Sequence, residues 1–246
     1  MKKWFLRFKA LLLVPYIRKK LVLVRIFYFV RIRRTLKTLD SNEAFDVTVK
    51  HNLNGLKMCN NRMDLLIRPV SVIETLNKNC KILVIGPRNE NDLFSLLAHG
   101  FAWRNIYGLD LITYSHKIIL GDMHKMSFAD NFFDVVLCGW TLSYSSTPGK
   151  AAKEICRVVR NGGIVGIGVE YSTMNKEDVE HLLGYAIQDY ERLTNRINSV
   201  PEIMTLFNGN VDHVYLDHNA PNRISHSRSG RANKVSNVVA IFSIKK

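Results

Sequence analysis

Five short apolar runs, each ending at a glycine or an acidic residue, constrain this chain more than any other feature. The runs are KILVI (81–85), NIYGL (105–109), KIIL (117–120), DVVLC (134–138) and IVGIGV (164–169). A continuous apolar run fits a strand buried on both faces, as in a parallel sheet. Segments with helical spacing at 91–99 and 150–160 lie between runs, which predicts βαβ units with right-handed crossovers. Late strands at 213–216 and 236–244 follow a helix predicted at 176–193, and the last strand is predicted to be antiparallel.

A basic and apolar arm precedes this pattern. Residues 1–39 contain twelve Lys and Arg residues and no Asp or Glu, whereas the other 207 residues hold 23 bases and 21 acids. We therefore divide the chain into an arm, 1–39, and a domain, 40–246. The longest uncharged stretch of the arm is Ala10 to Ile17, which includes Pro15. A membrane-spanning helix needs about 20 apolar residues, so the sequence predicts neither a span nor a signal peptide.

Three interpretations of the arm stay open. Its apolar side chains can enter the interface of an anionic membrane while the bases reach the headgroups. Alternatively, the arm packs on the domain as a helical extension, or it clamps nucleic acid, the least favoured partner. On the first interpretation the arm governs location and not folding. The four cysteines are scattered without close pairing, which predicts reduced thiols and a cytoplasmic protein, peripheral at the inner face of the cell membrane.

Polar residues gather where the predicted strands end. Ligands of open α/β sheets bind outside the carboxyl ends of the strands, where Gly86, Asp110, Asp122, Trp140 and Glu170 fall. Gly86 lets a ligand approach the backbone. Asp110 can accept hydrogen bonds from two ribose hydroxyls, and Asp122 from an exocyclic amine.

The first loop, GPRNEN, separates two classes of nucleotide cofactor. It has one glycine and a proline, so it is a poor cradle for the pyrophosphate of NAD. S-adenosylmethionine carries no phosphate, so it does not require this loop to bind a pyrophosphate.

These stretches resemble the class I S-adenosylmethionine-dependent methyltransferases. Their sequence is most similar to members thought to act in polysaccharide or envelope-glycan biosynthesis. The resemblance covers residues 80–171 and is carried by ILVIGPRNEND, IYGLDL, GDMHKMSFADNFFDVVLCGWTLSY and KAAKEICRVVRNGGIVGIGVEY. It implies an α/β, Rossmann-like sheet that is mostly parallel with an antiparallel last strand, extended by the basic N-terminal helical arm. The chain departs from the family in its reduced glycine motif. It also departs in the short spacing from Asp110 to Asp122, which predicts a loop at 111–116 in place of a helix.

The resemblance implies a set of site residues. S-adenosylmethionine would contact Gly86, Pro87, Arg88, Glu90, Asp110, Leu111, Asp122, Met123, Gly139 and Trp140, with Trp140 over the adenine and Arg88 toward a carboxylate. Glu170, and next His124, are the candidates for a catalytic base, which a sugar hydroxyl acceptor would need. No metal site is predicted.

The favoured function is methyl transfer from S-adenosylmethionine to an oxygen of a glycan or glycolipid precursor near the cytoplasmic membrane surface. Two alternatives stay open. One is an RNA methyltransferase that uses the arm as a phosphate clamp, although the near-neutral domain argues against it. The other is a non-catalytic scaffold with a methyltransferase-like fold.

Overall fold

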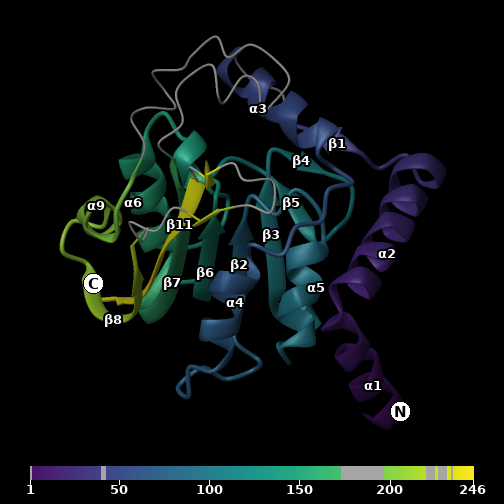
Figure 1. Ribbon diagram of the computed structural model, residues 1–246, viewed down its shortest axis with the longest axis horizontal. Coiled ribbons are helices and arrows are strands. Elements are labelled where there is room, and N and C mark those ends of the chain that lie inside the picture. The colour runs from purple at the N-terminus through teal and green to yellow at the C-terminus, as the bar shows by residue number, and fades with distance from the viewer. Residues whose placement is uncertain (1, 40–42, 173–196, 220–224, 227–231, 234) are drawn as a thin grey trace.

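A seven-stranded sheet forms the centre of the protein in the computed structural model (Figure 1). The structure describes residues 2–39, 43–172, 197–219, 225–226, 232–233 and 235–246. The strand order is β5-β3-β2-β6-β7-β11-β8. The parallel strands are β2 (Ile82–Ile85), β3 (Ile106–Asp110), β5 (Ile118–Leu120), β6 (Phe133–Gly139) and β7 (Val159–Ser172). Strand β11 (Val235–Ile244) is antiparallel to β7 and to β8 (Val211–His218), which confirms the predicted α/β fold with its antiparallel last strand.

Helices cover both faces of this sheet. One face carries α1 (Lys2–Leu12), α2 (Pro15–Ile26), α4 (Asp64–Ser71) and α5 (Asn91–Ala98), and the other carries α6 (Pro148–Val158) and α9 (Val200–Leu206). The side chains of β2 alternate between the two layers: Ile82 and Val84 join the first core cluster, Leu83 and Ile85 the second. This double burial explains why the strands lack the polar alternation of a half-exposed sheet.

The remaining elements are short. They are the π-helix η1 (Phe27–Ile32), α3 (Glu43–Asn54), the 3-10 turns η2 (Trp103–Asn105) and η3 (Leu142–Tyr144), and the strands β1 (Lys37–Thr38), β4 (Ile112–Thr113), β9 (Ser225–His226) and β10 (Ala232–Asn233). As predicted, no helix fits between β3 and β5. The sequence did not predict β4, which pairs with β1 of the arm, or α9, whose Ser199 hydroxyl accepts from the Glu202 N–H at its start. The helix predicted at 176–193 lies outside the described residues.

The arm packs against the domain along α5. Leu12, Val22 and Ile26 are buried in the first core cluster. The Arg18 side chain is 1% exposed and pairs with Asp64 at 3.2 Å. Arg25 pairs with the fully buried Glu90. These contacts argue against the expectation that the arm is dispensable for folding, because two of its bases are counter-ions of buried carboxylates.

The helices of the arm are short. Within the described ranges, every helix is too short or too polar to span a bilayer.

Candidate functional site

The first turn of the site follows β2 at the carboxyl edge of the sheet. Gly86 has a φ of +71°, a conformation that favours glycine. A Cβ at this position would lie 2.1 Å from the Thr141 hydroxyl oxygen, so Thr141, at the end of β6, closes over the turn. Gly86 therefore serves two needs, the backbone turn and the close approach of a neighbouring strand end.

Asp110 lies at the end of β3, beside this turn, and is 4% exposed. One of its carboxylate oxygens accepts from the Arg88 N–H at 2.7 Å, and the other accepts from the Ile112 N–H at 3.2 Å and from the Asn52 amide at 3.0 Å. Burial raises the pKa of the Asp110 carboxyl, and the two N–H donors offset part of that rise. Asn52 of α3 thus donates to the carboxylate that the sequence predicted to accept from ribose hydroxyls.

Arg88 brings a half-buried positive charge to the same place. Its guanidinium lies against the backbone of Gly55, where a Cβ would come within 2.6 Å of Nη1. The Nε atom is buried and has no hydrogen-bond partner within the described part of the chain. An unsatisfied buried donor is costly, and a carboxylate is the partner that would satisfy it.

Asp122 and His124 form a hydrogen-bonded pair after β5. The Gly121 N–H donates to the Asp110 carbonyl at 3.0 Å, which places this loop beside Asp110. The Asp122 Oδ1 lies 2.5 Å from His124 Nδ1 and 2.9 Å from the His124 N–H. The Nε2 atom lies 2.6 Å from the Ser145 hydroxyl oxygen. A carboxylate only accepts, so Nδ1 carries a hydrogen, and Nε2 can accept from the Ser145 hydroxyl when it carries none.

Trp140 and Glu170 lie near β7 and β11, farther along the strand order from Asp110 and Asp122. The Trp140 indole covers Gly168 of β7, and its N–H donates to the Asn237 side chain of β11 at 3.2 Å. The indole thus packs toward β7 and β11, not toward β3 and β5, where an adenine would lie. The Glu170 carboxylate pairs with Arg62, whose guanidinium also lies over the indole.

The structure gives Glu90 a different role from the predicted cofactor contact. Its side chain is fully buried, and its carboxylate accepts from Arg25 at 2.5 and 2.8 Å and from the Ser115 hydroxyl at 2.8 Å. Both carboxylate oxygens of Glu90 accept hydrogen bonds from the arm or the β4–β5 loop. Glu90 therefore attaches the arm to the domain and does not face a ligand.

The other four predicted contacts lie at the same edge. Pro87 is buried against Gly108 of β3, and Gly139 is buried against the Met63 side chain. Leu111 and Met123 are half-buried, packed against the first and second core clusters respectively. Both therefore follow the acidic strand ends as the sequence predicted, while their contact with a ligand stays a prediction.

The middle of the chain matches a known family. Residues 89–167 match the family described as "Methyltransferase domain". Solved structures of low identity share the fold. A candidate sarcosine dimethylglycine methyltransferase from Galdieria sulphuraria is 14% identical, with 74% of this chain and 85% of that chain covered and a TM-score of 0.54. The MccD protein is 14% identical, with 75% and 96% covered and a TM-score of 0.51. A search of curated protein sequences found no match.

Residues 89–167 thus resemble a methyltransferase domain on a Rossmann-like sheet, and S-adenosylmethionine is the methyl donor that this resemblance implies. The residues at the strand ends fit that methyl donor on two observations. The unsatisfied Arg88 Nε suits a carboxylate, and the Asp110 carboxylate at the end of β3 suits ribose hydroxyls. Asp110 would hold the ribose, with Asn52 as a second polar group beside it.

Sequence reasoning missed three residues of this site. Asn52 lies in the 40–79 segment, where no clear pattern was visible, and it meets Asp110 across 58 residues of chain. Thr141 and Ser145 follow the predicted strand 134–138, so their place at the carboxyl edge could have been inferred. Their partners, Gly86 and His124, carry no local sequence signal of these contacts.

Proposed function

We propose that the protein is an S-adenosylmethionine-dependent methyltransferase that methylates a hydroxyl of a glycan or glycolipid precursor. The observation that carries the proposal is the pair of carboxylates, Asp110 and Asp122, at the ends of adjoining strands within a region that matches methyltransferase domains. S-adenosylmethionine supplies an electrophilic methyl group when bound. A hydroxyl acceptor must then lose its proton, so the site needs a base.

His124 is the base that the geometry favours over Glu170. Asp122 fixes the ring with its hydrogen on Nδ1, which leaves the Nε2 lone pair to take a proton. The Ser145 oxygen at 2.6 Å marks where a hydroxyl can reach Nε2, and an acceptor hydroxyl would replace it. Glu170 is already paired with Arg62, so its carboxylate would have to break that contact to act.

The roles of the remaining side chains follow from their contacts. Arg88 would bind the carboxylate of the donor, and Asp110 would orient its ribose. Both bonds from Asp122 to His124 use Oδ1, so Oδ2 is the oxygen that would accept from an exocyclic amine.

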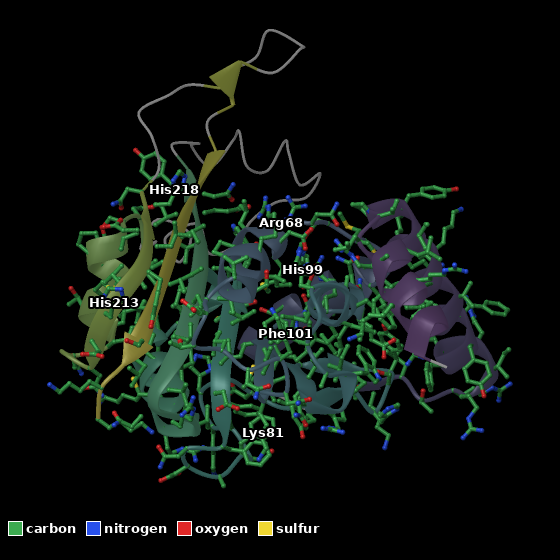
Figure 2. All side chains as sticks on the ribbon, turned by 90° about the horizontal axis from the view of Figure 1, so that it is seen from below. Arg68, Lys81, His99, Phe101, His213 and His218 are labelled. Atoms are coloured by element: carbon green, nitrogen blue, oxygen red, sulfur yellow. The ribbon has the colours of Figure 1, made fainter. Side chains whose placement is uncertain are left out.

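The test is transfer of a labelled methyl group. The full chain is incubated with methyl-labelled S-adenosylmethionine and extracts of membrane lipid, glycan and RNA. We expect label in the carbohydrate-containing fraction, and we expect it to survive mild alkali, as ethers do and esters do not. His124→Gln should lower the turnover by about 100-fold or more, with S-adenosylhomocysteine binding unchanged. His213→Gln, on the exposed edge strand β8, is the matched control (Figure 2).

Three results would contradict the proposal, the third only in the role given to His124. Label in RNA would favour the nucleic-acid alternative. Absence of label together with absence of S-adenosylhomocysteine binding would favour a scaffold. Full activity of His124→Gln would remove the histidine from the mechanism while leaving methyl transfer standing.

A further inference from the structure

The outer face of the arm is both apolar and basic, an unusual combination for a solvent-facing surface. We define it by its exposed large apolar side chains: Leu6, Leu11, Leu13, Val14, Tyr16, Val24, Phe27, Tyr28 and Ile32. Their exposed fractions range from 45% to 67%. Six other large apolar side chains are comparably exposed in the rest of the described chain, so more than half of this exposure falls within its first 32 residues.

Exposed bases are interleaved with these apolar side chains. They are Arg7, Lys19, Lys20, Arg31, Arg33, Arg34 and Lys37, and no acid occurs before residue 40. Three other bases of the arm point elsewhere: Arg18 and Arg25 are paired with the domain, and Lys9 donates to the Gly100 carbonyl at 3.3 Å. The arm thus uses three bases to attach to the domain, and its seven exposed bases have no acid within the arm's own sequence to pair with.

Helical periodicity explains how one segment presents two faces. Arg18, Val22 and Ile26 of α2 are spaced four residues apart and are buried against the domain. Tyr16, Lys20 and Val24 have the same spacing, half a turn away, and are exposed. The Lys20 ammonium lies 5.3 Å from the centre of the Tyr16 ring. Side chains of α2 project from the side of the molecule away from the sheet (Figure 2).

We infer that the outer face of the arm docks the protein on the surface of an anionic lipid bilayer. Bases without acids call for a negatively charged partner, and a patch of exposed Leu, Val, Phe and Tyr calls for an apolar one. A bilayer interface offers both, because acyl chains take up the apolar side chains while anionic headgroups pair with the bases. Nucleic acid would satisfy the bases only. A second copy of the chain would bring like charge against like charge.

Attachment to the domain makes this surface a fixed platform. Arg25 holds Glu90 through two hydrogen bonds, and Arg18 also donates to Asn91 at 3.2 Å, so α2 is fixed to the start of α5. The lipid-facing side chains are therefore held in place before binding, which lowers the ordering cost of docking.

The experiment is sedimentation of the full-length protein with vesicles of phosphatidylcholine alone and of phosphatidylcholine mixed with phosphatidylglycerol. We expect binding to the mixed vesicles at low salt, weaker binding at high salt, and little binding to phosphatidylcholine alone. Lys19→Gln and Lys20→Gln should each weaken binding about fivefold, the fold-change that corresponds to about 1 kcal/mol per base. Val24→Ser with Phe27→Ser should weaken it at least tenfold, because the apolar side chains no longer enter the interface.

Matched controls distinguish binding through this surface from nonspecific adsorption to vesicles. Val72→Ser removes an apolar side chain that is 79% exposed at the end of α4, and Lys153→Gln removes an exposed base of α6. Both should leave vesicle binding unchanged. Because all of these side chains are exposed, the variants should keep the urea midpoint of the wild type, and circular dichroism confirms that they fold.

Four results would overturn the inference. They are absence of binding to mixed vesicles at low salt, equal effects of Val72→Ser and the double apolar variant, and binding that ignores the loss of Val24 and Phe27. The fourth is a wild-type dimer in analytical ultracentrifugation that Val24→Ser with Phe27→Ser dissociates, because that would assign the face to a second copy.

Discussion

Arg25→Ala tests whether the arm is part of the folded core. The Glu90 side chain is 0% exposed, whereas that of Arg25 is 27% exposed. Removing the guanidinium leaves a buried carboxylate with the Ser115 hydroxyl as its remaining side-chain donor. Breaking a buried pair in this way costs about 3–5 kcal/mol. Because water can reach part of Arg25, we expect the lower end, about 3 kcal/mol, a large share of the stability of an ordinary domain.

The assay is urea unfolding followed by circular dichroism, with four variants. Arg25→Ala should lower the midpoint strongly, and Glu90→Gln should lower it less, because a neutral amide is cheaper to bury than an unpaired charge. The double variant should be more stable than Arg25→Ala alone, which gives a coupling energy of about 1–3 kcal/mol. Arg31→Ala, an exposed base of the same arm, is the control and should stay within about 0.5 kcal/mol of the wild type.

One result would refute this reasoning. If Arg25→Ala unfolds at the same urea concentration as Arg31→Ala, the arm is not held by the buried pair. Deletion of residues 1–38 would then leave a stable domain, whereas the packing of the arm predicts that this deletion impairs folding.

Three further predictions concern the site and its surroundings. Asp110→Ala should weaken S-adenosylhomocysteine binding by roughly 10- to 100-fold in calorimetry, since hydrogen bonds to a charged group contribute about 1.5–3 kcal/mol each; unchanged affinity in the folded variant would exclude the ribose role. Gly86→Ala should lower the thermal midpoint, because the new Cβ meets the Thr141 side chain at a positive φ, and Thr141→Ala should restore part of the loss; no change in midpoint would contradict the close approach. Burial raises the pKa of Asp92 from 3.8 to about 7, so the folded state keeps a proton that the unfolded chain has released, and stability should fall as the pH rises from about 4 to about 7. Asp92→Asn should flatten this part of the stability curve, and a slope identical to that of the wild type would exclude Asp92 as its source.

The sheet could be predicted because its signal is local. Each parallel strand is apolar on both faces, so a run such as KILVI stands out whatever it packs against. The positions of the acids at the ends of β3 and β5 follow from the positions of the strands. Asp110 and Asp122 could therefore be predicted to lie at neighbouring strand ends.

The attachment of the arm and the packing of Trp140 could not be predicted in the same way. Arg18 and Arg25 look like the other bases of the arm, and their ion pairs depend on Asp64 and Glu90, carboxylates 46 and 65 residues away. A run of charged residues indicates an exposed segment, and only a known carboxylate partner reveals that one of the charges is paired inside the fold. Likewise, the indole of Trp140 packs on Gly168 and Asn237, which approach it only because β7 and β11 pair beside β6.

The direction of the arm has a consequence for how substrate would arrive. Helix α5 follows β2, so it starts at the carboxyl edge of the sheet and ends at the opposite edge. Arg25 contacts Glu90 at the start of α5, and Lys9 contacts Gly100, two residues beyond its end, so the arm runs alongside the strands (Figure 1). A bilayer beneath the outer face of the arm would therefore lie parallel to the strands, and the carboxyl edge would open sideways along the membrane surface. A lipid-linked acceptor could then reach the site by lateral diffusion without leaving the membrane. The rate would depend on the number of acceptors per unit area of membrane and not on their bulk concentration.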